Sequence, residues 1–124
     1  MKKKIAVLSF LSAMLISTTV FASSGYIGKS MTISNALSGS SDIGNNTTGT
    51  ARVDVNTISD TGGCTKVNVF IMNTGTGSIT PSYRFQAQNT KFYSVTPGNI
   101  KAVFRRDCTN GGTMKIGYNF VYNF

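Results

Sequence analysis

The side chains that most often perform catalysis are scarce in this chain of 124 residues. It contains no histidine and no glutamate, so a Ser-His-Asp or Cys-His arrangement is impossible. Its only carboxylate side chains belong to four aspartates, Asp42, Asp54, Asp60 and Asp107. Two of them could act together as a glycosidase-like pair, but their spacing does not favour it. Because three of the four lie in turn-like sequence, where aspartate usually caps a turn, we expect the protein not to be an enzyme.

Ligands for a metal or a cofactor are equally few. A transition-metal site needs several His, Cys or carboxylate ligands, and only the four aspartates remain if the cysteines pair. The stretch DIGNN at residues 42–46 offers oxygen atoms, but a single aspartate supplies little charge for calcium. The stretch TGTGS at residues 74–78 lacks the lysine and the following helix of a phosphate-binding loop. We therefore expect neither a metal nor a cofactor.

Two cysteines, Cys64 and Cys108, carry the only thiol groups of the chain. Pairing is expected in a protein that leaves the reducing cytosol, and the chain has no CxxC motif or histidine to activate a free thiol. The predicted bridge closes a loop of about 45 residues, which stabilises a fold by about 4 kcal/mol in the chain-entropy model. We expect one disulfide that joins the ends of two strands.

The first 22 residues have the pattern of a secretory signal peptide. Three lysines follow the initiator methionine, an apolar run without charge comes next, and Val20 and Ala22 precede Ser23 as a cleavage site requires. The run is also long enough for an uncleaved membrane anchor, although serine and threonine interrupt it. We expect cleavage near Ala22–Ser23 and export to the periplasm or the extracellular space. Removing this segment leaves 102 residues, enough for one domain.

The net charge of the full chain is +8, and the signal segment carries three of its lysines, which leaves +5 for the rest. The remaining basic residues are scattered, and Arg105–Arg106 is their only adjacent pair. A nucleic-acid site would gather basic and stacking aromatic residues on one face, so we expect no nucleic-acid partner. This charge favours an anionic membrane surface or envelope polymer as partner. The alternative is a basic surface that only keeps the protein soluble.

Residues 23–49 are rich in Ser, Gly, Asn and Thr, and they predict one short strand, Tyr26 to Ile33, followed by a long polar loop. From residue 50 onward, apolar residues alternate with polar ones, which is typical of half-buried strands. These segments are ARVDVNTIS, TKVNVFIMN, SYRFQAQ, KFYSV, IKAVFRR and MKIGYNFVYNF. Turn-forming residues separate them, and helix formers are few. We predict an all-β fold: a small antiparallel β-sandwich, or a small barrel, of about six or seven short strands, with residues 50–124 as its main part.

The last segment has the most regular alternation in the chain. Every second residue back from the terminus is large and apolar: Phe124, Tyr122, Phe120, Tyr118, Ile116 and Met114. We expect residues 114–122 to turn this side to the core as the closing strand. The turn-like TNGG before it predicts a hairpin with the IKAVFRR strand. Because it ends on a phenylalanine, the segment also looks like the terminal strand of an outer-membrane barrel.

Aromatic residues that the core does not need are candidates for binding. Phe92 and Tyr93 are adjacent in a predicted strand, so one of them points away from the core, next to Lys91. Exposed rings with basic groups nearby bind glycans or protein partners. The candidate binding surface therefore consists of Lys91, Phe92, Tyr93, Arg105 and Arg106. The alternative is that the rings only fill the core of a small sandwich.

These patterns leave three classes of function. The first is a secreted, non-catalytic binding or structural protein at the bacterial cell surface or outside the cell, with an envelope glycan or protein as partner. The second is a secreted cationic toxin, either bacteriocin-like or membrane-active. The third is a subunit of an oligomeric outer-membrane β-structure, although most predicted strands are shorter than the about nine to eleven residues that such strands need. The sequence favours the first class and leaves the oligomeric state open.

Overall fold

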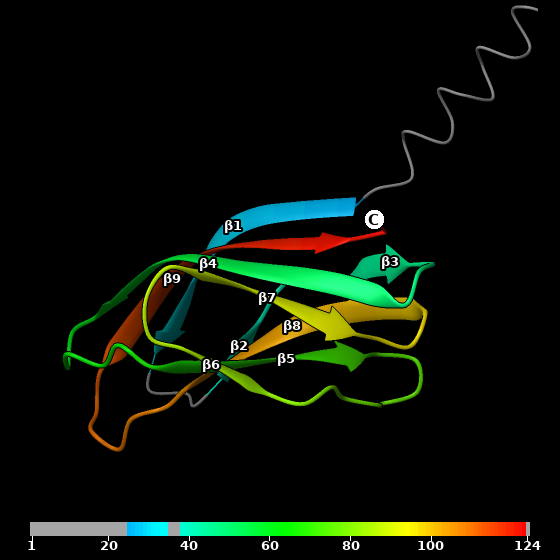
Figure 1. The fold of residues 1–124 in the computed structure, drawn as a ribbon. Helices are drawn as coiled ribbons and strands as arrows, with labels where there is room; N and C mark the ends of the chain where they lie inside the picture. The colour runs from blue at the N-terminus through cyan, green and yellow to red at the C-terminus, as the bar shows by residue number, and fades with distance from the viewer. Residues whose placement is uncertain (1–24, 35–37, 124) are drawn as a thin grey trace, which may run out of the picture.

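The computed structural model of this protein describes residues 25–34 and 38–123. It consists of two antiparallel β-sheets packed face to face (Figure 1). The strands are β1 (Gly25–Ser34), β2 (Ser38–Ser40), β3 (Gly44–Asn46), β4 (Thr50–Asp60), β5 (Val67–Asn73), β6 (Tyr83–Phe85), β7 (Asn89–Ser94), β8 (Gly98–Arg106) and β9 (Thr113–Tyr122). The four-stranded sheet has the order β1-β9-β4-β7, and the five-stranded sheet has the order β2-β8-β5-β6, with β3 also paired to β8. The predicted all-β sandwich is confirmed, with nine strands in the described residues instead of six or seven.

Some of the sequence-based predictions fall on residues outside the described ranges. They are the signal peptide at residues 1–22 with its cleavage site at Ala22–Ser23, and the role of Phe124. Over residues 25–34 and 38–123, no helix has the length and apolarity needed to cross a membrane.

The core lies between the sheets and is built from the alternate residues that the period-two pattern predicts. On β4 these are Ala51, Val53 and Val55, all fully buried. On β9, burial alternates in the same way from Met114 to Phe120. The prediction that the last strand turns its apolar side to the core is therefore confirmed. This strand does not lie at a sheet edge, however, because β1 and β4 flank it.

The predicted hairpin between the last two strands is wrong. β8 belongs to the five-stranded sheet, where β5 and β2 flank it, whereas β9 belongs to the four-stranded sheet. The link of residues 107–112 therefore crosses from one sheet to the other. The alternation of apolar and polar residues shows which side of a strand faces the core. It does not show whether two consecutive strands pair in one sheet or lie in opposite sheets, because the buried side is the same in both cases.

The polar stretch that the sequence predicts as a loop after β1 contains two strands of three residues each. β2 and β3 pair with successive parts of β8. Between them the hydroxyl of Ser41 accepts the backbone N–H of Ala102 at 2.9 Å, in place of a backbone acceptor. Strands this short and polar carry no period-two signal, which is why the stretch resembles a loop in the sequence.

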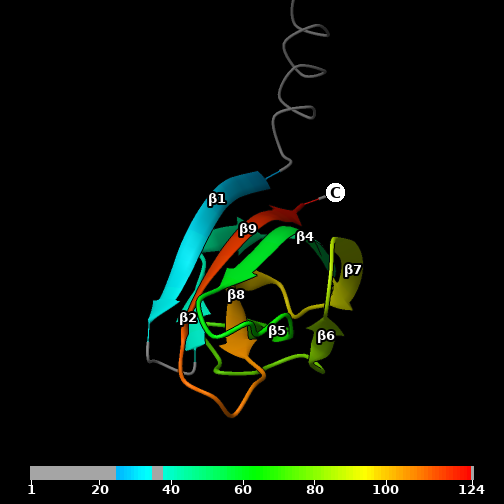
Figure 2. The ribbon, with the colours of Figure 1, turned by 90° about the vertical axis from the view of Figure 1, so that its left-hand side faces the viewer.

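The two long sides of the sandwich are closed by side chains. Figure 2 shows β1 on one side and β6 with β7 on the other. On the β1 side, Lys29 forms an ion pair with Asp42, which lies between β2 and β3. On the other side, the rings of Tyr83 and Tyr93 lie 5.1 Å apart, centroid to centroid. Ion pairing and ring packing thus connect sheet edges that share no backbone ladder.

The predicted disulfide between Cys64 and Cys108 is confirmed. Cys64 lies in the link from β4 to β5, and Cys108 lies in the link from β8 to β9. Both links cross between the sheets, so the bridge joins two crossovers at one end of the sandwich. It therefore joins covalently two links that lie outside the strands of both sheets.

Candidate functional site

The outer face of the four-stranded sheet carries a row of four side chains, one from each strand. Tyr26 of β1 is paired with Val121 of β9. Arg52 of β4 lies opposite Val121 on one side and opposite Phe92 of β7 on the other. Successive residues of a strand point to opposite sides, and Ala51, next to Arg52, is fully buried. The row therefore points away from the core.

Two large aromatic side chains stand at the ends of this row. Tyr26 is 63% exposed, and Phe92 is 58% exposed. Neighbouring strands lie about 4.8 Å apart, so three spacings separate the Cα atoms of these two residues by about 14 Å. A single exposed ring needs no explanation, but two rings at the ends of one row bound a stretch of the sheet surface that suits an extended ligand.

A second row, of polar groups, runs parallel to the first. It consists of Gly28 of β1, Asn119 of β9, Asp54 of β4 and Thr90 of β7. The Tyr26 hydroxyl donates to Asn119 Oδ1 at 2.8 Å. The Thr90 hydroxyl donates to Asp54 Oδ1, also at 2.8 Å. A Cβ atom on Gly28 would lie 2.6 Å from the Tyr26 oxygen, so the missing side chain lets the ring lie across the sheet and reach Asn119.

An ion pair connects the two rows. Arg52 Nη2 donates to Asp54 Oδ2 at 3.1 Å. Arg52 Nε lies 3.0 Å from Asp54 Oδ1, at ion-pair distance but outside hydrogen-bond geometry. Both side chains are held in place and remain partly exposed, which suits the recognition of hydroxyl groups. We call this surface the aromatic–polar face; its residues are Tyr26, Arg52, Asp54, Thr90, Phe92, Asn119 and Val121.

The residues that the sequence predicts as a binding surface lie in different places. Phe92 is on the aromatic–polar face, whereas its neighbour Tyr93 is buried. The Tyr93 hydroxyl donates to the Val69 carbonyl at 2.9 Å, across the sandwich, and burial raises the pKa of this phenol. Lys91 lies on the Tyr93 side of β7, with its Nζ 5.9 Å from the centroid of the Tyr83 ring. Of the two adjacent rings, Phe92 is therefore the exposed one.

The two arginines of the predicted surface point to opposite sides of β8. Arg105 is exposed on the outer face of the five-stranded sheet, whereas Arg106 is buried. Of the aromatic–polar face, the sequence indicated only Phe92. Tyr26 and Arg52 lie on the polar sides of predicted strands, so the sequence indicates that both point outward. It does not reveal that their strands belong to one sheet in a register that places both residues in the same row.

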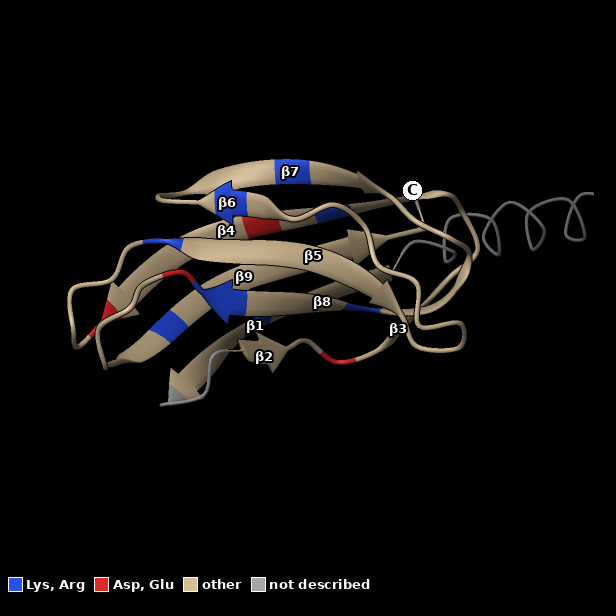
Figure 3. Cartoon of the chain, turned by 90° about the horizontal axis from the view of Figure 1, so that it is seen from below, with Lys and Arg blue, Asp and Glu red and all other residues tan. Residues whose placement is uncertain are grey.

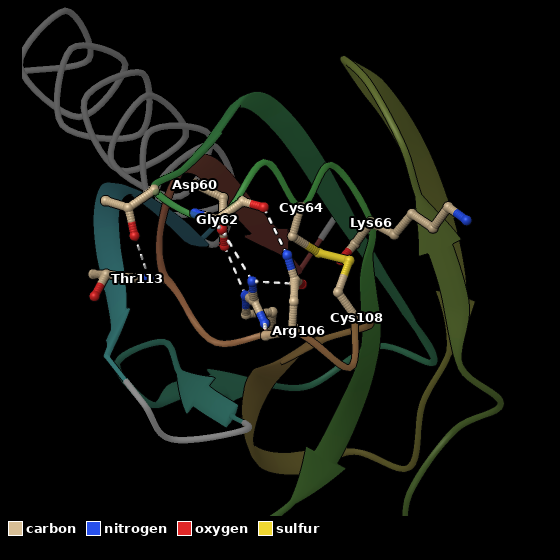
Figure 4. Close-up of polar contacts among 9 residues, drawn as sticks. Asp60, Gly62, Cys64, Lys66, Arg106, Cys108 and Thr113 are labelled. Carbon is tan, nitrogen blue, oxygen red and sulfur yellow. Dashed lines mark hydrogen bonds and ion pairs between the residues drawn. A yellow bond between two sulfur atoms is a disulfide. The ribbon is translucent and has the colours of Figure 1, made fainter.

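Arg106 holds the disulfide end of the sandwich together, as Figure 4 shows. Its Nε donates to Asp60 Oδ2 at 2.7 Å, and its Nη2 donates to Asp60 Oδ1 at 3.0 Å. Its Nη1 donates to the Asn110 carbonyl, and Asn110 Nδ2 donates to the Gly62 carbonyl at 2.7 Å. Asp60 and Arg106 are the last residues of β4 and β8, and Gly62 and Asn110 lie in the two links that the disulfide joins. The network satisfies its own polar groups, so its role is structural.

All four aspartates are held by basic side chains. The pairs are Lys29–Asp42, Arg52–Asp54, Arg84–Asp107 and Arg106–Asp60. The Arg106 guanidinium, hydrogen-bonded to Asp60, lowers the pKa of that carboxyl to about 2. Asp107 pairs with Arg84 of β6 at 2.7 Å, although Arg105 and Arg106 lie closer to it in the sequence. In the described ranges, no three His, Cys, Asp or Glu side chains lie close enough to hold a metal ion.

Two depressions in the described surface offer little enclosure. One is lined by Ile71, Thr80, Ile100 and their neighbours and has a volume of about 60 Å³. That is well below the about 300–1,000 Å³ of a typical small-molecule site. Another, of about 420 Å³, is open to solvent and is formed by residues from one short stretch, 84–89. The outer face of a sheet is therefore a better candidate for binding than either depression.

The aromatic–polar face is thus the best-formed candidate site in the described part of the chain. No protein-family model matches the sequence, and a comparison with curated proteins finds no significant relative. The function is therefore argued from the chemistry of this face and from the export pattern of the sequence.

Proposed function

We propose that this protein is an exported, non-catalytic binding protein of the bacterial cell envelope, and that its aromatic–polar face binds a glycan. The observation that carries this proposal is the pair of exposed rings, Tyr26 and Phe92, at the two ends of one row. The pattern of residues 1–22 supports export. The disulfide supports an oxidising compartment.

The chemistry of a sugar chain suits this face. A pyranose presents C–H groups that pack against aromatic rings, and hydroxyl groups that need donors and acceptors. Tyr26 and Phe92 supply the packing at points about 14 Å apart. Between them Arg52 donates, Asp54 accepts and Asn119 does both. A chain of several sugars contacts both rings at once, so an extended glycan is a better ligand than a single sugar.

The carboxylate of this face favours binding over hydrolysis. Asp54 accepts hydrogen bonds from Arg52 and from Thr90, which occupy its carboxylate oxygens. A glycosidase needs two carboxyl groups, about 5–9.5 Å apart, on either side of the scissile bond. Among the described residues of this face, Asp54 is the only acidic one. These features support a role in recognition without bond cleavage.

Co-sedimentation with insoluble glycans tests this proposal. The probes are purified peptidoglycan and chitin, and the exported chain is expected to pellet with at least one of them. Tyr26→Ala and Phe92→Ala should each weaken binding about ten-fold or more, because truncating an aromatic anchor removes much of the binding free energy. Tyr26→Phe keeps the ring and removes only the hydroxyl that donates to Asn119, so it should retain most of the affinity.

Ile79→Ala provides the matched control, because Ile79 is an exposed apolar residue associated with the five-stranded sheet. This variant should bind both glycans as the wild type does. A wild-type protein that stays in the supernatant with both probes would contradict the proposal. Equal weakening by Ile79→Ala and by the two ring variants would also contradict it, because the effect would then not belong to the aromatic–polar face.

A further inference from the structure

The outer face of the five-stranded sheet differs in chemistry from the aromatic–polar face. Arg105 of β8 and Arg84 of β6 lie in one row, on either side of the same β5 residue. Four residues earlier on β8, Lys101 lies beside Met72 of β5, which forms a bridge with Ile79. Basic side chains therefore stand at both ends of β8 on this face.

Apolar side chains fill the space between these basic ends. Phe70 and Val103 are paired across β5 and β8; both are buried, but they lie outside the core cluster between the sheets. The Arg105 guanidinium covers the Phe70 ring, with Cζ 5.1 Å from its centroid. At the edge of the face, Ile79 is 61% exposed and Ile43 is 57% exposed. Two aliphatic side chains thus project into solvent beside a basic surface.

The register places Ile43 on the same face. It directly precedes Gly44, whose partner on β8 is Ile100, so the chain at Ile43 runs beside Lys101. A Cβ atom on Gly44 would meet the Tyr122 ring, so Gly44 faces inward and Ile43, one residue earlier, faces outward. Lys66 directly precedes the fully buried Val67, and its carbonyl accepts the backbone N–H of Asp107, so Lys66 faces outward beside β8. We call this surface the basic face; its residues are Lys66, Arg84, Lys101 and Arg105, with Ile43, Met72 and Ile79, over the buried Phe70 and Val103.

Much of the excess positive charge lies on the basic face. Each of the four aspartates is already paired with a basic side chain. Within residues 25–34 and 38–123, the basic side chains outside these ion pairs are Lys66, Lys91, Lys101, Arg105 and Lys115. Lys66, Lys101 and Arg105 belong to the basic face, and Lys115 lies on the opposite side of the sandwich. Figure 3, drawn from the side of the five-stranded sheet, shows basic positions on β6 and β8.

We propose that the basic face docks the protein onto a bilayer surface that contains anionic phospholipid. Basic side chains near such a surface are attracted to the headgroup phosphates. Exposed aliphatic side chains enter the boundary between the headgroups and the acyl chains. An anionic polymer would attract the cations equally but has no apolar region for Ile43 and Ile79. The combination of both kinds of group on one face therefore favours the bilayer.

Docking through the basic face leaves the aromatic–polar face turned away from the membrane. The two faces are the outer sides of different sheets, with the core between them (Figure 1). They share no residue, so membrane docking does not depend on glycan binding. If both occur, one molecule holds a glycan close to a membrane surface.

Co-sedimentation with lipid vesicles tests the docking. The exported chain should pellet with vesicles of phosphatidylcholine and phosphatidylglycerol, and much less with phosphatidylcholine alone. Lys101→Gln and Arg105→Gln should each weaken binding about five-fold, the contribution of one cation near an anionic surface. Lys115→Gln is the matched control, because it makes the same charge change on the other side of the sandwich. It should bind as the wild type does.

The double variant Ile43→Ser/Ile79→Ser distinguishes a bilayer from an anionic polymer. It keeps the charge of the wild type, and we expect it to bind the anionic vesicles more weakly while its thermal unfolding stays cooperative. Tyr26→Ala should keep vesicle binding, so failure of this proposal and failure of the glycan proposal are distinguishable. Equal binding to both kinds of vesicle, or equal weakening by Lys115→Gln, would overturn the docking. If the serine variant bound the vesicles as well as the wild type and polyphosphate also captured the protein, the ligand of the basic face would be an anionic polymer and not a bilayer.

Discussion

Arg106 carries a full positive charge into a site where its side chain is 5% exposed. Asp60 neutralises this charge through two hydrogen bonds, and Asn110 accepts two more from the same guanidinium. A buried ion pair adds little net stability compared with apolar packing, but the loss of one partner leaves a buried charge without compensation. The pair therefore determines how the two crossover links meet more than how stable the fold is.

This pair predicts a loss of stability in acid. In the folded protein the hydrogen bond from Arg106 lowers the pKa of Asp60 from its ordinary 3.8 to about 2. The folded state therefore binds fewer protons than the unfolded state, and the contribution of Asp60 is complete only above the unfolded pKa. It is lost as the pH falls from about 4 to about 2. We expect the urea midpoint of unfolding to fall over this interval.

Asp60→Asn is the control for this prediction. It removes the titrating carboxyl and leaves Arg106 with a neutral acceptor, so it should be less stable than the wild type at neutral pH. Its urea midpoint should change less than that of the wild type between about pH 4 and about pH 2. An equally steep loss in the variant would assign the acid sensitivity to other carboxyl groups.

Among the strands, β9 is the one on which the four-stranded sheet depends. It pairs with β1 from Gly25 opposite Tyr122 to Ser34 opposite Thr113, and it pairs with β4 on its other side. In the described residues β1 has no other strand as a ladder partner. Without β9, β1 would lose its hydrogen-bonded neighbour, and β4 would keep only β7.

Deleting residues 118–124 is predicted to unfold the domain. The deletion removes Tyr118 and Phe120, both buried, and truncating one large core aromatic already destabilises by about 3–5 kcal/mol. A small domain has a free energy of unfolding of about 5–15 kcal/mol, and the loss of two such residues, together with the strand pairing of half of β9, is of the same size. Circular dichroism should show no native sheet signal, and urea should produce no cooperative transition.

Two single variants on β9 show whether packing causes this effect. Phe120→Ala should lower the free energy of unfolding by about 3–5 kcal/mol. Val121→Ala, next to it but pointing outward, should change it by about 1 kcal/mol or less. A truncated protein with a native spectrum and a cooperative transition would show that β9 is not essential for folding.

Strand faces are predictable from this sequence, whereas strand partners are not. The alternation from Met114 to Phe120 depends only on which side of the strand is buried, and that is a local property. Partners depend on contacts between distant segments. Tyr26 and Phe92 join one row only through β9 and β4, so the sequence could indicate Phe92 and could not connect it to Tyr26. The incorrect β8–β9 hairpin has the same cause.

At the scale of the whole molecule, the chain crosses between the sheets at most of its links, and neighbouring strands in a sheet are rarely consecutive in the sequence. A fold of this kind depends on contacts between distant segments, which form slowly because loop closure must come first. Cys64 and Cys108 restrain two of these crossovers in the unfolded chain as well as in the folded one. The disulfide therefore acts on the equilibrium between the folded and the unfolded protein and not on the binding surfaces.

Reduction of the disulfide should therefore destabilise the fold and leave the binding faces intact. Cys64 and Cys108 are 44 residues apart, and a loop of this length contributes about 4 kcal/mol in the chain-entropy model. Urea unfolding of the oxidised protein, the reduced protein and the Cys64→Ala/Cys108→Ala variant measures this difference. Arg52 lies near the start of β4 and Cys64 beyond its end, so any reduced protein that remains folded should bind peptidoglycan as the oxidised protein does. Equal urea midpoints with and without the disulfide would contradict its stabilising role. Selective loss of glycan binding in folded, reduced protein would show that the aromatic–polar face depends on the disulfide.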